Sequence, residues 1–161
     1  SRRLLNVIGE LSLVAGAPGL VGGQVVDLEC EGKQVDLETL EYIHLHKTGA
    51  LLKASVRTGA MIAGADEKLL KALTTYAEGI GLAFQIIDDI LDLTSSSEKL
   101  GKTAGKDLIA DKTTYPKLLG MDESKKRAFD LVDKAKQALE PWGQDTKNLI
   151  SLANFITNRD R

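Results

Sequence analysis

The stretch FQIIDDILD, residues 84–92, is apolar almost throughout, yet three carboxylates and one amide interrupt it. On a helix, Gln85, Asp88 and Asp92 are spaced i, i+3 and i+7 and form one stripe, with Asp89 at its edge. Apolar residues cover most of the remaining circumference of that helix. Because a helix that is apolar nearly all round is usually buried, we expect these acidic groups to face an interior cleft.

Such a cluster of carboxylates requires a cation or protonation. Two unit charges about 4 Å apart repel by about 1 kcal/mol in water and by about 4 kcal/mol at an effective dielectric constant of about 20. Magnesium takes oxygen ligands, keeps several waters and commonly bridges one or two carboxylates to substrate phosphates. The rise from Asp88 to Asp92 is about 6 Å along the helix axis, which suits such a bridge. The alternative is an ordinary helix with a few aspartates on its wet face, which the apolar surroundings disfavour.

Length, charge and cysteine content exclude several classes of protein. The 161 residues fit one domain, residues 1–161, and the 21 Lys+Arg and 23 Asp+Glu residues leave a net charge of −2. No basic run or stripe is present, so we expect no nucleic-acid partner. Cys30 is the single cysteine, which excludes an internal disulfide and is typical of a reducing compartment. We also expect no membrane span, because no apolar run reaches about 18 residues, and we find no secretory signal.

Apolar residues at helical spacing recur along the chain, and strand-like alternation is nowhere convincing. The sequence therefore predicts an all-α fold. Asp36 is a plausible N-cap for the third helix. Gly79 and Gly81 each cost a helix about 1 kcal/mol relative to alanine, which close packing on a neighbour or a ligand would explain. The predicted helices are residues 2–17, 20–30, 36–63, 66–94, a short helix from 117, a run through 122–139, and, after a break at 141–143, a last helix through 149–156.

A polar segment, residues 95–115, follows the acidic stretch. Polar segments longer than about 12–15 residues are often active-site lids or binding loops. This one holds Lys102, Lys106 and Lys112, whose positive charges beside the aspartates favour a phosphate lid over a flexible linker. The segment is not a P-loop, because three residues rather than four separate Gly101 from Gly105, and Asp107 rather than Ser or Thr follows Lys106.

Two upstream patterns are weak when taken alone. Gln24 and Asp27 share a helix face and follow two glycines that permit close backbone approach, but a capping or surface role explains them equally well. Lys47 lies on the next helix, and without other evidence the simpler interpretation is that it is a solvated surface lysine. His44 and His46 are two residues apart and do not face each other on a helix, so we expect no zinc pair.

Taken together, these patterns resemble the C-terminal half of the trans-isoprenyl diphosphate synthases, the polyprenyl synthetase family. The order and spacing match over essentially all 161 residues, and residues 112–116, KTTYP, are most similar to the geranylgeranyl branch. The resemblance implies an antiparallel helical bundle around a central cavity, of which this chain is the C-terminal part. The segments that carry the resemblance are GQVVD at 23–27, KTG at 47–49, FQIIDDILD at 84–92, GK at 101–102 and DK at 111–112.

The resemblance also implies roles for individual residues. Asp88, Asp89 and Asp92 would be the second aspartate-rich motif of the family, which binds Mg²⁺ on an allylic diphosphate. Asp27 would lie near this motif and reach a metal through water. Five residues would contact the diphosphate: Lys47, Thr48, Gln85, Lys102 and Lys112. Of these, Lys47 and Lys102 would have catalytic roles.

The implied activity is that of a magnesium-dependent prenyltransferase, which condenses an allylic diphosphate with isopentenyl diphosphate and releases diphosphate, in isoprenoid and carotenoid biosynthesis. The product would be a short-chain isoprenyl diphosphate, most simply geranylgeranyl diphosphate. We expect a homodimer, or a heteromer with a related subunit, in a plastid or the cytoplasm. One alternative is a non-catalytic partner subunit of such a synthase. Another is a class I terpene cyclase, which fits Gln85, Asp88 and Lys47 less well.

The sequence departs from the family pattern in one respect. The family has a first aspartate-rich motif, and nothing before Gln24 matches it. We therefore expect this chain to be the C-terminal portion of a longer enzyme and to be inactive alone; the alternative is a shortened relative that has lost activity. In this family the product chain length is set near that first motif, so it does not follow from these residues.

Overall fold

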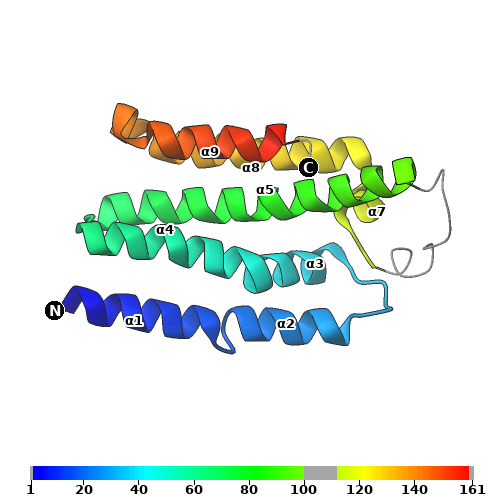
Figure 1. The fold of residues 1–161 in the computed structure, drawn as a ribbon, viewed down its shortest axis with the longest axis horizontal. Coiled ribbons are helices and arrows are strands. Elements are labelled where there is room, and N and C mark those ends of the chain that lie inside the picture. Colours follow the sequence, from blue (N-terminus) through cyan, green and yellow to red (C-terminus); the bar gives the residue numbers. More distant parts are fainter. Residues whose placement is uncertain (1, 100–111, 160–161) are drawn as a thin grey trace.

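A computed structural model describes residues 2–99 and 112–159, with side chains described for residues 2–94 and 112–159. Every regular element in these ranges is helical (Figure 1), which confirms the predicted all-α fold. The elements in order are α1 (Arg2–Ala15), α2 (Leu20–Glu29), α3 (Leu37–Ile43), the π-helix η1 (His44–Gly49), α4 (Ala50–Ala63), α5 (Glu67–Lys99), α7 (Tyr115–Leu119), α8 (Met121–Leu139), the 3₁₀ helix η2 (Glu140–Thr146) and α9 (Lys147–Asn158).

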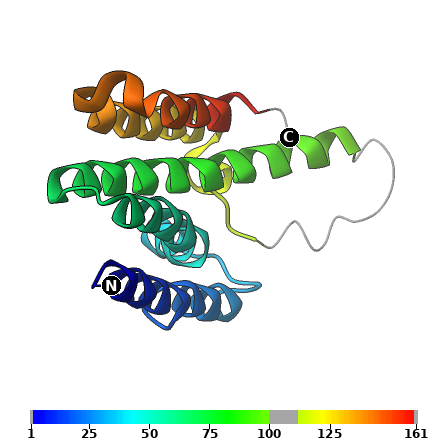
Figure 2. The ribbon, with the colours of Figure 1, turned by 60° about the vertical axis from the view of Figure 1, so that its left-hand side comes forward.

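Helix α5, which contains the acidic stretch, is the centre of the bundle. In Figures 1 and 2 it lies between α8 and α9 on one side and α3 and α4 on the other, with α1 and α2 outside the latter pair. Its most extensive contacts are with α8 and α4. Tyr76, Ala83 and Ile86 are fully buried, so the apolar side of α5 forms the core. This position holds the aspartates of the same helix at the edge of a rigid core.

The two glycines in α5 lie where neighbouring backbones approach closely, as the sequence predicted. A Cβ atom at Gly79 would lie 3.0 Å from the carbonyl oxygen of Leu131 on α8. A Cβ atom at Gly81 would lie 3.4 Å from the Cα atom of Gly49. Close packing therefore accounts for Gly79, whereas a Cβ atom at Gly81 would make an ordinary van der Waals contact.

The predicted helix at 36–63 is present but contains a π-helical turn that the sequence did not reveal. The backbone N–H of Thr39 donates to Asp36 Oδ1 at 2.9 Å, which confirms the N-cap. Hydrogen bonding from Thr39 lowers the pKa of the Asp36 carboxyl. The helix ends where Gly64 adopts φ +84°. The π-turn at His44–Gly49 matters because such turns frequently occur at functional sites.

Two predicted boundaries differ from the structure, and one predicted break is present. Helix α5 continues to Lys99, past the expected end at residue 94, since no glycine or proline interrupts the chain there. Helix α1 ends at Ala15 rather than at 17. The expected break after α8 is the 3₁₀ helix η2, in which Gly143 adopts φ +51°.

By mean hydropathy, one stretch of the described chain is apolar enough for a membrane span, which the sequence analysis did not expect. Residues Arg2–Glu29 contain an 18-residue window of mean hydropathy 1.6, of which 17% is buried, and they are the one such stretch in the described part of the chain. By itself this is weak evidence for a span. The chain turns at residues 16–19, so α1 and α2 are separate helices of 14 and 10 residues. Each is shorter than the roughly 20 residues that a transmembrane helix needs.

Tyr76 links α5 to α9 and gives a testable pH dependence. Its hydroxyl donates to the Leu149 carbonyl oxygen at 2.7 Å, and burial raises its pKa to about 12. An unfolded tyrosine ionises near pH 10, so this group's contribution to stability is complete below pH 10 and is lost as the pH rises to about 12. Burial also raises the pKa of Tyr115, which adds to the same alkaline loss.

We therefore expect Tyr76→Phe to lower the free energy of unfolding at pH 7 by about 0.5–1.5 kcal/mol, the usual net value of one hydrogen bond. The variant should also lose less stability than the parent between pH 10 and pH 12. Urea denaturation at a series of pH values measures both effects. An unchanged alkaline slope would contradict this role for Tyr76.

Candidate functional site

Helix α2 meets the π-turn η1 at Gly23. A Cβ atom at this buried glycine would lie 2.3 Å from the backbone nitrogen of Lys47 and 2.8 Å from the carbonyl carbon of His46. Only glycine permits this approach. One turn further along α2, Asp27 Oδ2 lies 2.5 Å from Lys47 Nζ. Two segments that the sequence analysis singled out, at 23–27 and 47–49, are thus in direct contact.

The Lys47–Asp27 pair is partly buried, with side-chain exposures of 37% and 20%. Lys47 is therefore a paired, oriented side chain, unlike the solvated surface lysine that the residue suggests in isolation. An ammonium group has three donors, and the contact with Asp27 uses one of them. The other two can be offered to an anionic ligand. Thr48, the next residue of η1, is also partly buried.

The aspartates of α5 do not all face the same cleft. Asp89 is 6% exposed, and its Oδ2 atom accepts a hydrogen bond from the Tyr115 backbone N–H at 3.0 Å and lies 3.2 Å from His44 Nε2. Asp88 is partly exposed, with the Gln85 amide 3.4 Å from its Oδ2 atom. Asp92, one turn further on, is exposed. Consecutive helical residues point about 100° apart, which separates Asp89 from the other two.

Asp89 connects three parts of the chain. It joins α5 to η1 through His44 and to the start of α7 through Tyr115. The rings of His44 and Tyr115 stack with centroids 5.7 Å apart. The Tyr115 hydroxyl donates to Glu41 Oε1 at 3.1 Å, and Glu41 in turn forms an ion pair with Arg127. The segment that leads into α7 is therefore fixed relative to the acidic helix.

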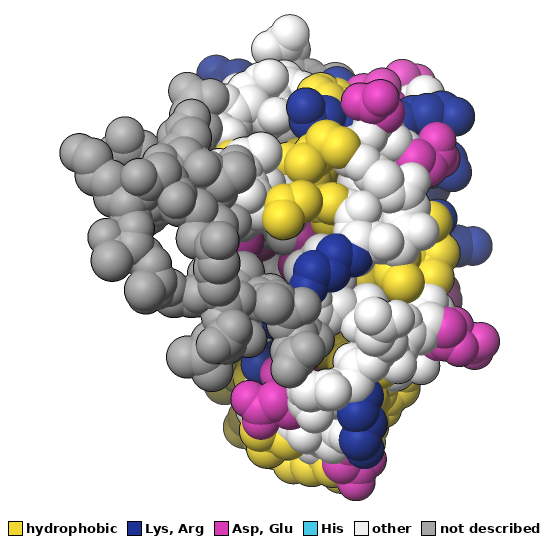
Figure 3. All heavy atoms as spheres, turned by 90° about the vertical axis from the view of Figure 1, so that its right-hand side faces the viewer, with side chains coloured by type: hydrophobic (Ala, Val, Ile, Leu, Met, Phe, Trp, Pro, Cys, Tyr) yellow, Lys and Arg dark blue, Asp and Glu magenta, His cyan; other side chains and the backbone are white. Residues whose placement is uncertain are grey.

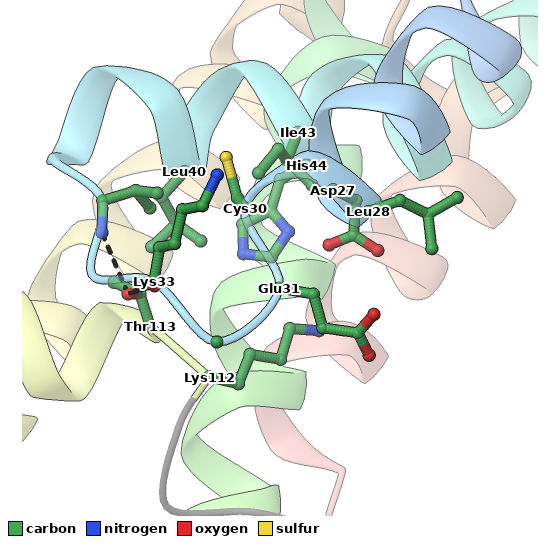
Figure 4. A pocket seen from close by; sticks show the side chains of 12 residues that line it. Asp27, Leu28, Cys30, Glu31, Lys33, Leu40, Ile43, His44, Lys112 and Thr113 are labelled. Atoms are coloured by element: carbon green, nitrogen blue, oxygen red, sulfur yellow. Dashed lines mark hydrogen bonds between the residues drawn. The ribbon is translucent and has the colours of Figure 1, made fainter.

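Lys112 belongs to this fixed segment. The next residue, Thr113, accepts a hydrogen bond from the Val35 backbone N–H at 3.2 Å and donates to the Lys33 carbonyl at 3.4 Å. These contacts place Lys112 at the rim of a pocket of about 320 Å³ between the end of α2 and the turn into α3. Figure 4 shows Asp27, His44 and Lys112 around this pocket.

Viewed from the end of the bundle at which α7 lies, the surface carries acidic and basic side chains close together, with hydrophobic side chains beside them (Figure 3). Lys102, which the sequence analysis placed at the diphosphate, and Lys106 fall outside the described residues.

The donor set suits magnesium better than zinc. In the described part of the chain, no three His, Cys, Asp or Glu residues are grouped closely enough to hold a metal by themselves. Structural zinc sites need a closed set of four nitrogen or sulfur ligands, which is absent from these residues. Magnesium needs only one or two carboxylates when waters and substrate phosphates complete its coordination. Asp88 and Asp92, accessible and one turn apart, fit that requirement.

Arg159 is a residue of this site that sequence reasoning missed. It follows α9, and its guanidinium forms an ion pair with Asp88. The same group donates to the Phe84 carbonyl oxygen at 3.3 Å and lies 4.1 Å from the centroid of the Phe84 ring. The partners are 71 residues or more apart in sequence, and no local pattern links them.

The chain is similar to known proteins over most of its length. The sequence model described as polyprenyl synthetase matches residues 5–149. The chain is 54% identical over 158 residues to a dimethylallyltranstransferase of Fischerella ambigua, covering 98% of this chain and 46% of the relative. It is 52% identical over 162 residues to a chloroplastic geranylgeranyl pyrophosphate synthase of Catharanthus roseus, covering 99% and 45%.

Among solved structures, the chain resembles a geranyltransferase of Helicobacter pylori complexed with magnesium and isoprenyl diphosphate. The TM-score is 0.77 at 32% sequence identity, and the match covers 98% of this chain and 52% of that one. The chain thus spans about half the length of the curated relatives and solved structures that it matches.

Proposed function

Because the chain belongs to the polyprenyl synthetase family, we propose that it supplies the allylic-diphosphate side of a magnesium-dependent prenyltransferase. That enzyme condenses an allylic diphosphate with isopentenyl diphosphate to geranylgeranyl diphosphate. The observation that carries the proposal is the Asp89 junction. It joins η1, which bears Lys47 and Thr48, to the acidic helix and to the segment that bears Lys112.

In this reaction the allylic carbon–oxygen bond ionises, leaving a delocalised carbocation and a diphosphate with additional negative charge. Lys47 and Lys112, with Lys102, donate to the diphosphate oxygens and stabilise that charge, while Asp27 orients Lys47. Magnesium held by Asp88 and Asp92, with Asp89 holding the helix in position, supplies Lewis-acid stabilisation when bound. The Gln85 amide positions the diphosphate.

The remaining steps need no side-chain nucleophile. The double bond of isopentenyl diphosphate attacks the allylic carbon to form the new carbon–carbon bond, and the departing diphosphate accepts the proton that is then lost. The apolar side chains that surround the acidic stretch of α5 limit the access of water to the carbocation.

We further propose that the whole protein is a homodimer, or a heteromer with a related subunit, in a plastid or the cytoplasm. The plastid is supported by the chloroplastic relative from Catharanthus roseus. Association, or the rest of the whole protein, would cover large apolar side chains exposed on the outer helices, a set larger than single scattered residues explain. They are Leu4, Leu5, Ile8, Leu11 and Leu13 on α1 and Val21, Val25 and Leu28 on α2.

The proposal is tested by calorimetric titration with farnesyl thiolodiphosphate, an allylic diphosphate analogue that ionises slowly. We expect saturable binding in the presence of Mg²⁺ and little in the presence of EDTA, because Asp88 and Asp92 would hold the diphosphate only through the metal. Farnesol, which lacks the diphosphate, is the control. Equal affinity with and without the metal would contradict the proposal. We expect little turnover from the 161 residues alone, since they hold one aspartate-rich motif.

A further inference from the structure

Arg159 is held beside the proposed metal site by contacts of three kinds. Its guanidinium lies over the Phe84 ring, donates to the Phe84 carbonyl oxygen and pairs with Asp88. The side chain is 11% exposed, whereas that of Asp88 is 41% exposed. The backbone of Arg159 is extended, with φ −75° and ψ 140°, so the chain leaves α9 and turns toward α5 at this residue. Arg159 is therefore an ordered part of the site.

One donor of this guanidinium remains unused. Arg159 Nε is buried and has no hydrogen-bond partner among the described residues. A buried donor without an acceptor costs about 1–3 kcal/mol, more when the group is charged. An anionic ligand that accepts from Nε and the adjacent Nη group together would remove that cost, because an arginine presents its donors in a planar fork that matches phosphate oxygens.

We propose that Arg159 exchanges partners when the site fills: it pairs with Asp88 in the metal-free protein and with a diphosphate oxygen in the loaded one. The inference rests on the proposed function, in which Asp88 is a magnesium ligand. A metal ion at Asp88 would place a second cation beside the guanidinium on one carboxylate, so the two cations repel and compete for Asp88 Oδ1. The contacts with Phe84 keep the displaced guanidinium beside the site.

The exchange predicts effects of opposite sign on two ligands. Arg159→Gln removes the competitor of the cation, so the affinity for Mn²⁺ alone, used as a spectroscopic substitute for Mg²⁺, should rise by about threefold or more. The same variant loses a phosphate donor, so the affinity for inorganic diphosphate at saturating Mg²⁺ should fall by about threefold or more. A merely structural role for Arg159 would weaken both.

Mn²⁺ binding can be followed by electron paramagnetic resonance, and diphosphate binding by calorimetry. Arg3→Gln is the charge-matched control, because Arg3 belongs to α1, which lies on the other side of the bundle from α9 (Figure 1), and its loss should change neither affinity. Arg159→Lys should give an intermediate value for diphosphate, since lysine keeps the charge but lacks the fork.

Asp88→Asn separates failure of this inference from failure of the proposed function. If Asp88→Asn loses Mn²⁺ binding while Arg159→Gln fails to raise it, the exchange is overturned and the metal site stands. If Asp88→Asn binds Mn²⁺ as the parent does, both proposals fail; if neither protein binds Mn²⁺ in the absence of diphosphate, the exchange alone is overturned. Should Arg159→Gln not fold, amide exchange in Asp88→Asn is decisive: it must speed up at residues 155–159 if Asp88 holds the C-terminal segment, and unchanged exchange refutes the contact.

Discussion

Replacing Asp88 with alanine is expected to weaken the magnesium-dependent binding of farnesyl thiolodiphosphate by about tenfold to a hundredfold. The change removes an accessible carboxylate that, in the proposed function, would hold the metal. Interactions with charged groups contribute about 1.5–3 kcal/mol, and every 1.4 kcal/mol corresponds to a factor of ten in affinity. Calorimetric titration at a fixed Mg²⁺ concentration measures the loss.

Lys47→Ala should weaken the same binding to a similar extent by a different route. It removes a diphosphate donor and leaves Asp27, with a side chain 20% exposed, without its cation. The double variant Asp27→Asn with Lys47→Ala separates these contributions, because it removes the unpaired charge as well as the donor.

Lys53→Ala is the matched control for Lys47→Ala. Lys53 lies on the adjoining helix α4 and also pairs with a carboxylate, Glu78, at 3.1 Å, but on the exposed surface. Its loss should leave diphosphate binding unchanged. If Asp88→Ala and Lys47→Ala both bind the analogue as tightly as Lys53→Ala does, the site assignment is wrong.

Local patterns predicted most of the helices because their determinants lie within a few residues of each other. Asp36 caps α3 through Thr39, three positions away, and Gly64 ends α4 through its own backbone conformation. The glycines of α5 were also informative, since glycine inside a helix costs about 1 kcal/mol relative to alanine and therefore indicates close packing at that position. Gly79 is packed in this way against the backbone of α8.

The site was predicted less completely, because its geometry depends on tertiary packing. Helical periodicity separates the directions of Asp88 and Asp89, but it does not say which of them meets His44 and Tyr115 and which remains accessible. The Arg159 contact depends on where the end of α9 lies relative to α5. Similarly, the role of Lys47 required the resemblance to a family, since a single lysine carries no pattern.

Gly23→Ala is expected to be among the most destabilising single substitutions that leave the site residues themselves unchanged. The added methyl group would lie 2.3 Å from the backbone nitrogen of Lys47, and a backbone atom cannot move aside as a flexible side chain can. Helix α2 must shift away from η1 instead. Overpacking of this kind typically costs 1–3 kcal/mol, and it outweighs the gain of about 1 kcal/mol in helix propensity.

The matched control is Gly59→Ala, at an exposed position inside α4 where a Cβ atom would meet nothing within 4 Å. This variant should gain up to about 1 kcal/mol, so the two glycine-to-alanine changes should have opposite signs in urea denaturation. Gly23→Ala should also weaken magnesium-dependent binding of the diphosphate analogue, because a shift of α2 carries Asp27 away from Lys47. Equal stability of the two variants would show that α2 does not depend on this contact.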